Sequence, residues 1–290
     1  MAYMLLNGEL IERSEGKIDI EDRGFQFGDG VYEVISVYGG HPFALNEHLD
    51  RLFESARKIY MNIPYSKTEL EDGIKRLLQK EKKNNCYVYM QFSRGTSIRN
   101  HIIPKTATGT LIIYLLDAKQ IDEWKQKGIK TVITEDIRWL RCDIKTTSLL
   151  GNVLVKQKAV EKNASEAILH RDGVVTEGSS TNVWIVKDRL IRTHPADHFI
   201  LNGITRREIL SICENHQFRC MEQRFTVDEL LEADEIFITS TTLEVMPVVE
   251  VDGQKISGGK PGPITRKLQS LFEQEIQFRC FDVKEKFSVK

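Results

Sequence analysis

The stretch from Asp136 to Thr181 constrains the fold most strongly, because it holds an irregular segment, a helix pattern and a hairpin pattern in succession. The irregular segment ends at Lys145, and the apolar residues that follow it recur at helical spacing. Further on, Arg171-Asp172-Gly173 is a turn signal between two strand-like runs, and Glu177 lies near the end of the second run. Strands and helices continue to alternate through the second half of the chain, which predicts an α/β fold.

Lys145 and Glu177 are the first candidates for chemistry. An amine fixed at the start of a helix can form a Schiff base with a carbonyl cofactor or substrate. A carboxylate at a strand end can keep a ring nitrogen protonated, as pyridoxal phosphate chemistry often requires. Type and spacing alone do not distinguish this pair from a solvated lysine and a structural glutamate.

The composition is that of a globular chain without a strong charge. Of the 290 residues, 41% are hydrophobic and 29% charged, and the formal net charge is −1. A charge so close to zero attracts neither nucleic acid nor an anionic membrane surface. No apolar run approaches the roughly 20 residues needed to cross a bilayer, and Asn7-Gly8 comes before any signal-like segment develops. The sequence predicts no nucleic-acid partner and no membrane association.

The five cysteines predict reduced thiols and a cytoplasmic location. Their number is odd, and no spacing matches a zinc site or a redox Cys-x-x-Cys pair. Cys142 is close to Lys145 but is expected to be a buried structural residue rather than a nucleophile. His194 and His198 could bind a metal, but Pro195 argues against a shared helical face and no further ligand is evident, so no metal is predicted.

The first half of the chain begins with strand signals. Asn7-Gly8 predicts a tight turn between two short strands. The run from Val31 to Tyr38 alternates as a strand, with Glu33 on the face that carries its apolar neighbours. Tyr32 points to the opposite face, which is either a core face or one wall of a pocket.

Two helices are expected next. Asn46 is a suitable N-cap for the first, and Ser66-Lys-Thr-Glu69 is a capping box for the second. Arg51 lies beside the apolar stripe of the first helix. Such an arginine usually packs its stem and exposes its head, whereas one that faces inward needs an anion.

Three further segments are candidate anion sites. The loop from Arg94 to His101 includes Arg99, and arginine binds carboxylates in a bidentate fork. Gly203-Ile204-Thr205 opens a helix at which Thr205 and Glu208 have capping-box spacing, so backbone N–H groups there could bind phosphate. Ser240 and Thr241 follow a strand and could complete a phosphate cup. The alternatives are a solvated loop, an ordinary capped helix and a turn.

The strand pattern restarts after a polar connector near residues 117–121. The sequence therefore predicts a smaller N-terminal domain of residues 1–118 and a larger domain of residues 119–290.

Several segments resemble the class IV pyridoxal-phosphate aminotransferases, from Tyr3 to about Phe272. The resemblance is carried by these stretches: 21–34, 46–51, 94–101, 135–145, 166–170, 177–183, 203–205 and 239–242. It implies an α/β enzyme of fold type IV, with an α+β N-terminal domain and a C-terminal pseudo-barrel domain that binds pyridoxal 5′-phosphate.

The resemblance also assigns roles to residues. It implies that Lys145 binds the cofactor covalently and moves the substrate proton, and that Glu177 pairs with the pyridine nitrogen. The phosphate cup it implies consists of Arg51, Ile204, Thr205, Ser240 and Thr241. It implies that the substrate α-carboxylate is bound by Tyr32, together with Arg99 and His101 from the neighbouring subunit of a homodimer.

The expected activity is transfer of the amino group of D-alanine and other D-amino acids to 2-oxo acids such as 2-oxoglutarate. The expected route is ping-pong, alternating pyridoxal and pyridoxamine phosphate. Within the class, the alternatives are an L-branched-chain aminotransferase and an aminodeoxychorismate lyase, and Tyr32, Arg99 and His101 argue against both. A non-catalytic protein that keeps the fold is a further alternative. Ile98 departs from the proline usual in this loop and removes no ligand.

Overall fold

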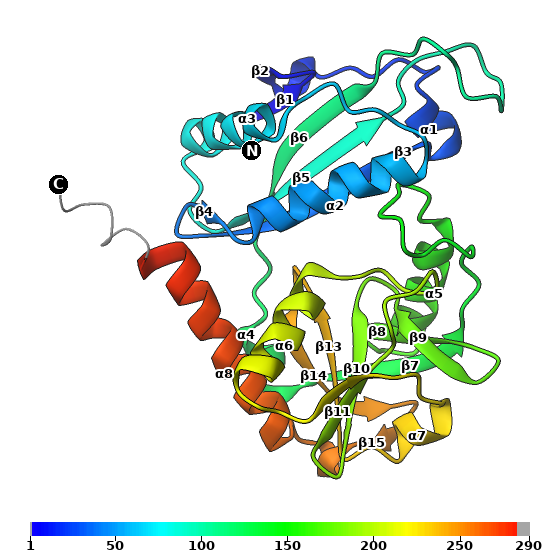
Figure 1. The fold of residues 1–290 in the computed structure, drawn as a ribbon, viewed down its shortest axis with the longest axis vertical. Coiled ribbons are helices and arrows are strands. Elements are labelled where there is room, and N and C mark those ends of the chain that lie inside the picture. Colours follow the sequence, from blue (N-terminus) through cyan, green and yellow to red (C-terminus); the bar gives the residue numbers. More distant parts are fainter. Residues whose placement is uncertain (1, 283–290) are drawn as a thin grey trace. The chain divides into compact units, whose positions relative to one another are not determined.

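The computed structural model describes residues 2–282, which form two compact units (Figure 1). The first unit contains the residues up to Ala118, the segment Ile144–Leu149 and the described residues from Phe278 on. The second contains Lys119–Asp143 and Leu150–Gln277. Lys145 thus belongs to the first unit, although most of the sequence around it belongs to the second.

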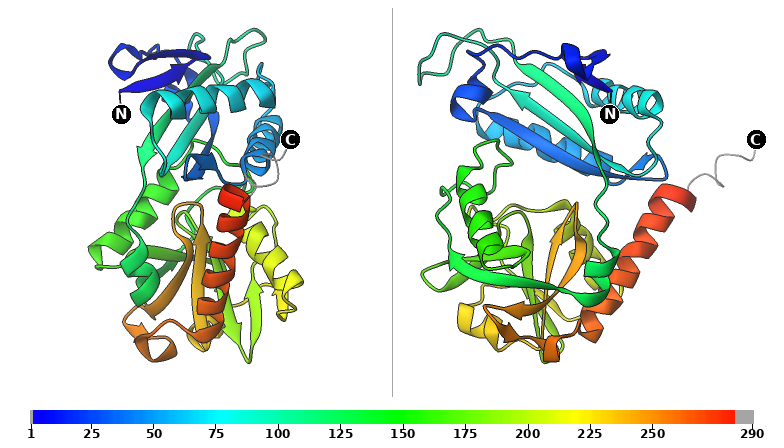
Figure 2. Two further views of the ribbon diagram at one scale, coloured as in Figure 1. Left: turned by 90° about the vertical axis from the view of Figure 1, so that its left-hand side faces the viewer. Right: turned by 180° about the vertical axis from the view of Figure 1, so that it is seen from behind.

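A six-stranded antiparallel sheet in the order β2-β1-β6-β5-β3-β4 forms the first unit. Its strands are β1 (Tyr3–Leu6), β2 (Glu9–Glu12), β3 (Gly30–Tyr38), β4 (His41–Pro42), β5 (Cys86–Ser93) and β6 (Thr110–Asp117). Its helices are η1 (Arg13–Glu15), α1 (Arg23–Phe27), α2 (Leu45–Lys58), α3 (Lys67–Glu81) and the short turn η3 (Phe278–Asp282). Figures 1 and 2, viewed from opposite sides, show α2 and α3 against one face of this sheet. Apolar side chains of both helices and of that face form one core.

The predicted strands of this unit are confirmed. Asn7 and Gly8 turn the β1–β2 hairpin with φ angles of 51° and 86°. In β3 the face that carries Glu33 is buried, and Tyr32 on the other face is half-buried.

One of the two predicted helix starts is wrong. Ser66 and Glu69 form the expected capping box of α3. Asn46, however, lies inside α2, whose N-cap is Ala44 in the left-handed region with a φ of 52°. The chain arrives from β4 through a tight connection, and this tertiary constraint overrides the preference of asparagine for the cap.

The second unit is a nine-stranded mixed sheet in the order β12-β11-β10-β13-β14-β7-β8-β9, with β15 paired to β14. Its strands are β7 (Ile129–Glu135), β8 (Glu166–Arg171), β9 (Val174–Gly178), β10 (Asn182–Lys187), β11 (Leu190–Thr193), β12 (Cys220–Glu222), β13 (Glu235–Ser240), β14 (Glu244–Val251) and β15 (Gln254–Lys255). Its helices are α4 (Asp122–Lys127), α5 (Leu150–Glu161), α6 (Ile204–Asn215), α7 (Val227–Leu231), η2 (Ser257–Gly259) and α8 (Pro263–Gln277). The edge strand β9 contacts β10, and Gly178 donates to the carbonyl of Thr181, so the sheet curls back on itself.

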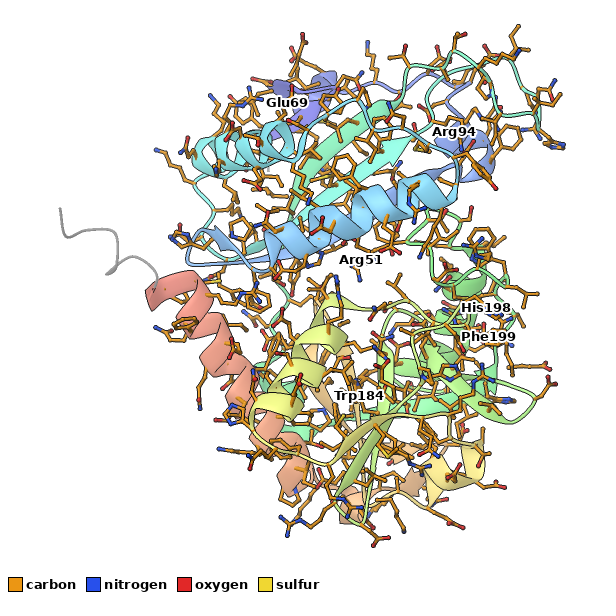
Figure 3. All side chains as sticks on the ribbon, viewed as in Figure 1. Arg51, Glu69, Arg94, Trp184, His198 and Phe199 are labelled. Carbon is orange, nitrogen blue, oxygen red and sulfur yellow. The ribbon has the colours of Figure 1, made fainter. Side chains whose placement is uncertain are left out.

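Apolar side chains fill the interior of this curled sheet. Elsewhere on it, Trp184 of β10 is fully buried and stacks on Phe237 of β13 at a ring separation of 5.4 Å (Figure 3). The predicted turn at Asp172-Gly173 joins β8 to β9, and the predicted helix after Lys145 is α5, so both predictions are confirmed.

None of the helices in residues 2–282 combines the length and the apolar character that crossing a bilayer would require.

Candidate active site

The Lys145 segment adds to the edge of β3 in the first unit. The N–H of Tyr32 donates to the carbonyl of Lys145 at 3.0 Å, and Thr146 forms a β-bridge with Val31. The N–H of Lys145 donates to Ser55 of α2 at 3.2 Å. Strand and helix thus both fix the backbone of Lys145, so its side chain starts from a defined point.

Tyr32 and Lys145 are in contact. The Lys145 Nζ atom lies 4.2 Å from the centroid of the Tyr32 ring, a distance at which an ammonium group is attracted to an aromatic face. The Tyr32 ring also stacks on Tyr89 at 5.7 Å. Of the two predicted meanings of the Tyr32 face, the structure shows a half-buried surface with the lysine against it.

Arg51 faces inward, and its anion in this structure is Glu33 (Figure 3). Its Nε and Nη2 atoms donate to the two carboxylate oxygens at 2.7 and 2.8 Å. His48 Nδ1 lies 2.7 Å from the same carboxylate. Glu33 and His48 are almost completely buried, so this cluster of three residues is a buried polar network inside the first unit.

The charges of this network follow from its burial. Burial alone would raise the pKa of Glu33, but Arg51 and His48 together lower this pKa well below its ordinary value. Burial lowers the pKa of His48, with Arg51 and Lys145 acting in the same direction and Glu33 against it. Glu33 is therefore ionised and His48 neutral near pH 7, so the carboxylate balances the charge of Arg51.

Sequence reasoning missed Glu33 and His48. The signal was present, because Glu33 shares its strand face with apolar residues. A carboxylate on such a face must find a partner inside the protein.

The basic loop divides into a structural part and an exposed part. Arg94 is buried, forms a bidentate ion pair with Asp29, and donates to the carbonyls of Ile59 and Tyr60 (Figure 3). Arg99 and His101 are exposed.

The side chains of Arg99 and His101 contact Phe27 rather than Tyr32. The guanidinium of Arg99 lies 4.5 Å from the centroid of the Phe27 ring, and the His101 ring meets that ring edge-on at 5.5 Å. The structure therefore brings two of the three predicted carboxylate ligands together and leaves Tyr32 apart from them.

In the second unit, Glu177 is buried at the end of β9. Arg138 Nη1 donates to it at 2.5 Å, and Asn182 Nδ2 and the N–H of Leu201 each donate at 3.0 Å. Burial raises the pKa of Glu177, with Arg138 and the Leu201 amide opposing the shift. The carboxylate is held by three donors and has one cationic neighbour that favours its ionised form.

Arg138 is a functional candidate that the sequence did not single out. Its guanidinium also donates to Asp136, which in turn accepts from Arg171 and Thr176. The pKa of Asp136 is lowered because both arginines outweigh the effect of burial. Glu177 therefore lies at one end of a connected network of charges.

The predicted anion site at the start of α6 is present, but its cap is not the predicted one. Gly203 is the N-cap, and Thr205 lies inside the helix. A Cβ atom on Gly203 would come within 2.2 Å of Asn182 Oδ1, which explains the glycine. Within the described chain, the N–H groups of Ile204 and Thr205 have no hydrogen-bond partner.

Ser240 and Thr241 lie at the end of β13. Ser240 Oγ accepts the N–H of Leu243, which makes it part of a turn. The neighbouring Thr239 Oγ1 accepts from Trp184 Nε1 at 3.0 Å and is fully buried.

Cys142 and the histidines near residue 196 have structural contacts. Burial raises the pKa of the Cys142 thiol to about 12, so it is not a thiolate near neutral pH. His194 Nδ1 lies 2.7 Å from the carbonyl of Val175, and the His198 ring packs on Phe199 (Figure 3).

The candidate residues therefore fall into two groups. Those in the first unit are Tyr32, Arg51, Arg99, His101 and Lys145, and those in the second are Glu177, Ile204, Thr205, Ser240 and Thr241.

Comparison with known proteins identifies the family. Residues 30–251 match the family model described as amino-transferase class IV. The chain is 47% identical to D-alanine aminotransferase of Bacillus licheniformis over 94% of this chain and 96% of the relative. It is 46% identical to D-alanine aminotransferase of Listeria monocytogenes serotype 1/2a over 96% and 97% of the two chains.

The structure is also similar to that of a branched-chain amino acid aminotransferase of T.th. complexed with N-(5′-phosphopyridoxyl)-L-glutamate. The TM-score is 0.90 at 26% identity, over 97% of this chain and 96% of the other. This likeness confirms the expected two-domain α/β fold of the type IV pyridoxal-phosphate enzymes. The family model and the relatives together show that this chain belongs to the class IV aminotransferases.

Proposed function

We propose that this chain is a D-amino acid aminotransferase that transfers the amino group of D-alanine and related D-amino acids to 2-oxo acids. The observation that carries the proposal is the 47% identity to D-alanine aminotransferase of Bacillus licheniformis over 94% of the chain. The route is ping-pong, so the amino group is held on the cofactor between the two half-reactions.

Pyridoxal 5′-phosphate is the cofactor of this class, and the residues present fit it. Two unpartnered amides at the start of α6 form the kind of site that binds a phosphate. Arg51, Ser240 and Thr241 would complete the phosphate site around Ile204 and Thr205. When bound, the cofactor supplies an electron sink for the charge that develops at the substrate Cα.

Three residues would hold the reactive part of the cofactor and move the proton. Lys145 would bind it covalently and then carry the proton that leaves the substrate Cα. Glu177 would accept a hydrogen bond from the protonated ring nitrogen. Arg138 supports that role, because a buried carboxylate next to an arginine favours its ionised form.

Tyr32, Arg99 and His101 would bind the substrate α-carboxylate. Arg99 and His101 would serve the neighbouring subunit of a homodimer, which would leave each active site incomplete without a second copy. Both side chains are exposed, and Ile98 and Ile102 beside them are 84% and 74% exposed, so a second copy has apolar surface to cover. We place the enzyme in the cytoplasm because its five cysteines are free thiols.

A second candidate is an L-branched-chain aminotransferase, because the similar solved structure carries that name. The identity of 26% to that protein, against 47% to the D-alanine enzyme, favours the D-amino acid.

Absorption spectroscopy of the holoenzyme decides between the two. We expect the visible cofactor band to disappear when D-alanine is added and to persist with L-leucine. Bleaching by L-leucine alone would assign the chain to the branched-chain activity. A protein that cannot be reconstituted with pyridoxal phosphate would refute both.

A further inference from the structure

A single ring, Phe27 at the end of α1, contacts three cationic or potentially cationic side chains. The guanidinium carbons of Arg99 and Arg23 lie 4.5 and 4.8 Å from its centroid. The His101 ring meets it at 5.5 Å with an interplanar angle of 66°. Arg99 and His101 are exposed loop residues, whereas Phe27 is half-buried.

The backbone between Arg99 and His101 is fixed by the same helix. Arg23, also on α1, donates from Nη1 to the carbonyl of Asn100 at 2.6 Å. Arg23 is 4% exposed and is itself held by Asp29, which also pairs with Arg94. The helix α1 thus contacts the backbone of the loop through Arg23 and its side chains through Phe27.

This contact leaves the guanidinium able to bind an anion. A ring attracts the face of a guanidinium, whereas a carboxylate binds to the N–H groups at its edge. Stacking on Phe27 therefore restricts the many rotamers of an exposed arginine without using the donors that a carboxylate needs.

We propose that Phe27 is a positioning residue for the substrate carboxylate, because it holds Arg99 and His101 in one arrangement before the substrate binds. The inference rests on the proposed function, in which these two residues bind the α-carboxylate. Phe27 itself contacts neither substrate nor cofactor.

The test is the pre-steady-state half-reaction of the holoenzyme with D-alanine, which gives a dissociation constant and a limiting rate separately. In Phe27→Leu we expect the dissociation constant to rise about fivefold, which corresponds to one exposed cation–π contact, with the limiting rate unchanged. The matched control is Phe25→Leu on the same helix, whose side chain is 79% exposed and should leave both quantities unchanged.

A second series removes the concern that Phe27→Leu misfolds. Replacing Phe27 with phenylalanines that carry one to five ring fluorines keeps the shape but weakens the negative face of the ring step by step. We expect the dissociation constant to rise steadily with fluorine number. A dissociation constant independent of fluorination, or a fall in the limiting rate alone, would overturn the proposal.

Arg99→Ala and His101→Ala separate this inference from the proposed function. If both variants bind D-alanine as tightly as the wild type, the carboxylate site itself is wrongly assigned. If they weaken binding while the Phe27 variants do not, only the positioning role of Phe27 is refuted.

Discussion

Replacing Glu33 with glutamine should destabilise the first unit strongly. The side chain keeps its shape but loses the charge that balances Arg51, and its amide would point a donor at Arg51 Nη2 or His48. Glu33 is fully buried and accepts three hydrogen bonds, two of them from the guanidinium. Removing one partner of a buried ion pair costs about 3–5 kcal/mol, which corresponds to a fall in melting temperature of roughly 10 °C.

The loss should depend on pH in a defined direction. The pKa of Glu33 lies below its ordinary value of 4.5 in the folded protein, so its contribution is complete above that pH and disappears as the pH falls. The difference between wild type and Glu33→Gln should therefore be largest near pH 7 and shrink below about pH 4.5.

Thermal unfolding of the apoenzyme, followed by circular dichroism at several pH values, measures this difference. The matched control is Glu54→Gln on α2, the helix that carries Arg51, because Glu54 pairs with Lys58 at the surface and is 53% exposed at its side chain. That variant should melt within about 1–2 °C of the wild type. If Glu33→Gln melted as the control does at pH 7, the buried charge would not be what holds Arg51 in place.

Three further predictions concern the site and its surroundings. Lys145→Ala should abolish turnover and the visible absorption of the bound cofactor, and near-normal turnover without an added amine would refute its assignment. Arg138→Met should move the acidic limb of the pH–activity profile upward by about 1–3 pH units, because Glu177 would lose the cation that favours its ionised form; an unmoved limb would contradict that role. Gly28→Ala should lower stability by about 1–3 kcal/mol more than Gly173→Ala, as measured by urea unfolding. Both glycines have positive φ angles, of 65° and 79°, but only at Gly28 would a new Cβ meet another residue, at 2.6 Å from Ser148 Oγ. Equal losses would show that the loop around Ser148 moves freely.

Local patterns in the sequence were enough to predict the elements that depend on neighbouring residues. The Asn7-Gly8 hairpin, the Ser66–Glu69 capping box and the strand alternation around Tyr32 all involve residues within a few positions of one another. The predictions at Asn46 and Thr205 were wrong because each helix starts where the preceding chain arrives, at Ala44 and at Gly203. In the second case the arrival is set by Asn182, which no local pattern could indicate.

The polar networks were the least predictable part of the site. Glu33 is 18 positions from Arg51, and Arg138 is 39 positions from Glu177. The sequence indicates that a charge on an apolar strand face needs a partner, but many arginines are available and only the fold selects one. The same limit applies to Phe27, whose contacts with Arg99 and His101 join an early helix to a distant loop.

The segment Ile144–Leu149 has a consequence for how the protein is made. It covers the edge of β3: Tyr32 donates to Lys145, and the hydroxyl of Thr147 donates to the carbonyl of Gly28. During synthesis on the ribosome, β3 emerges roughly a hundred residues before this segment does. Until then, the polar edge near Tyr32 has no cover and can pair with other chains. The N-terminal unit therefore cannot be completed during its own translation, and a fragment ending near residue 118 should aggregate where the full chain does not.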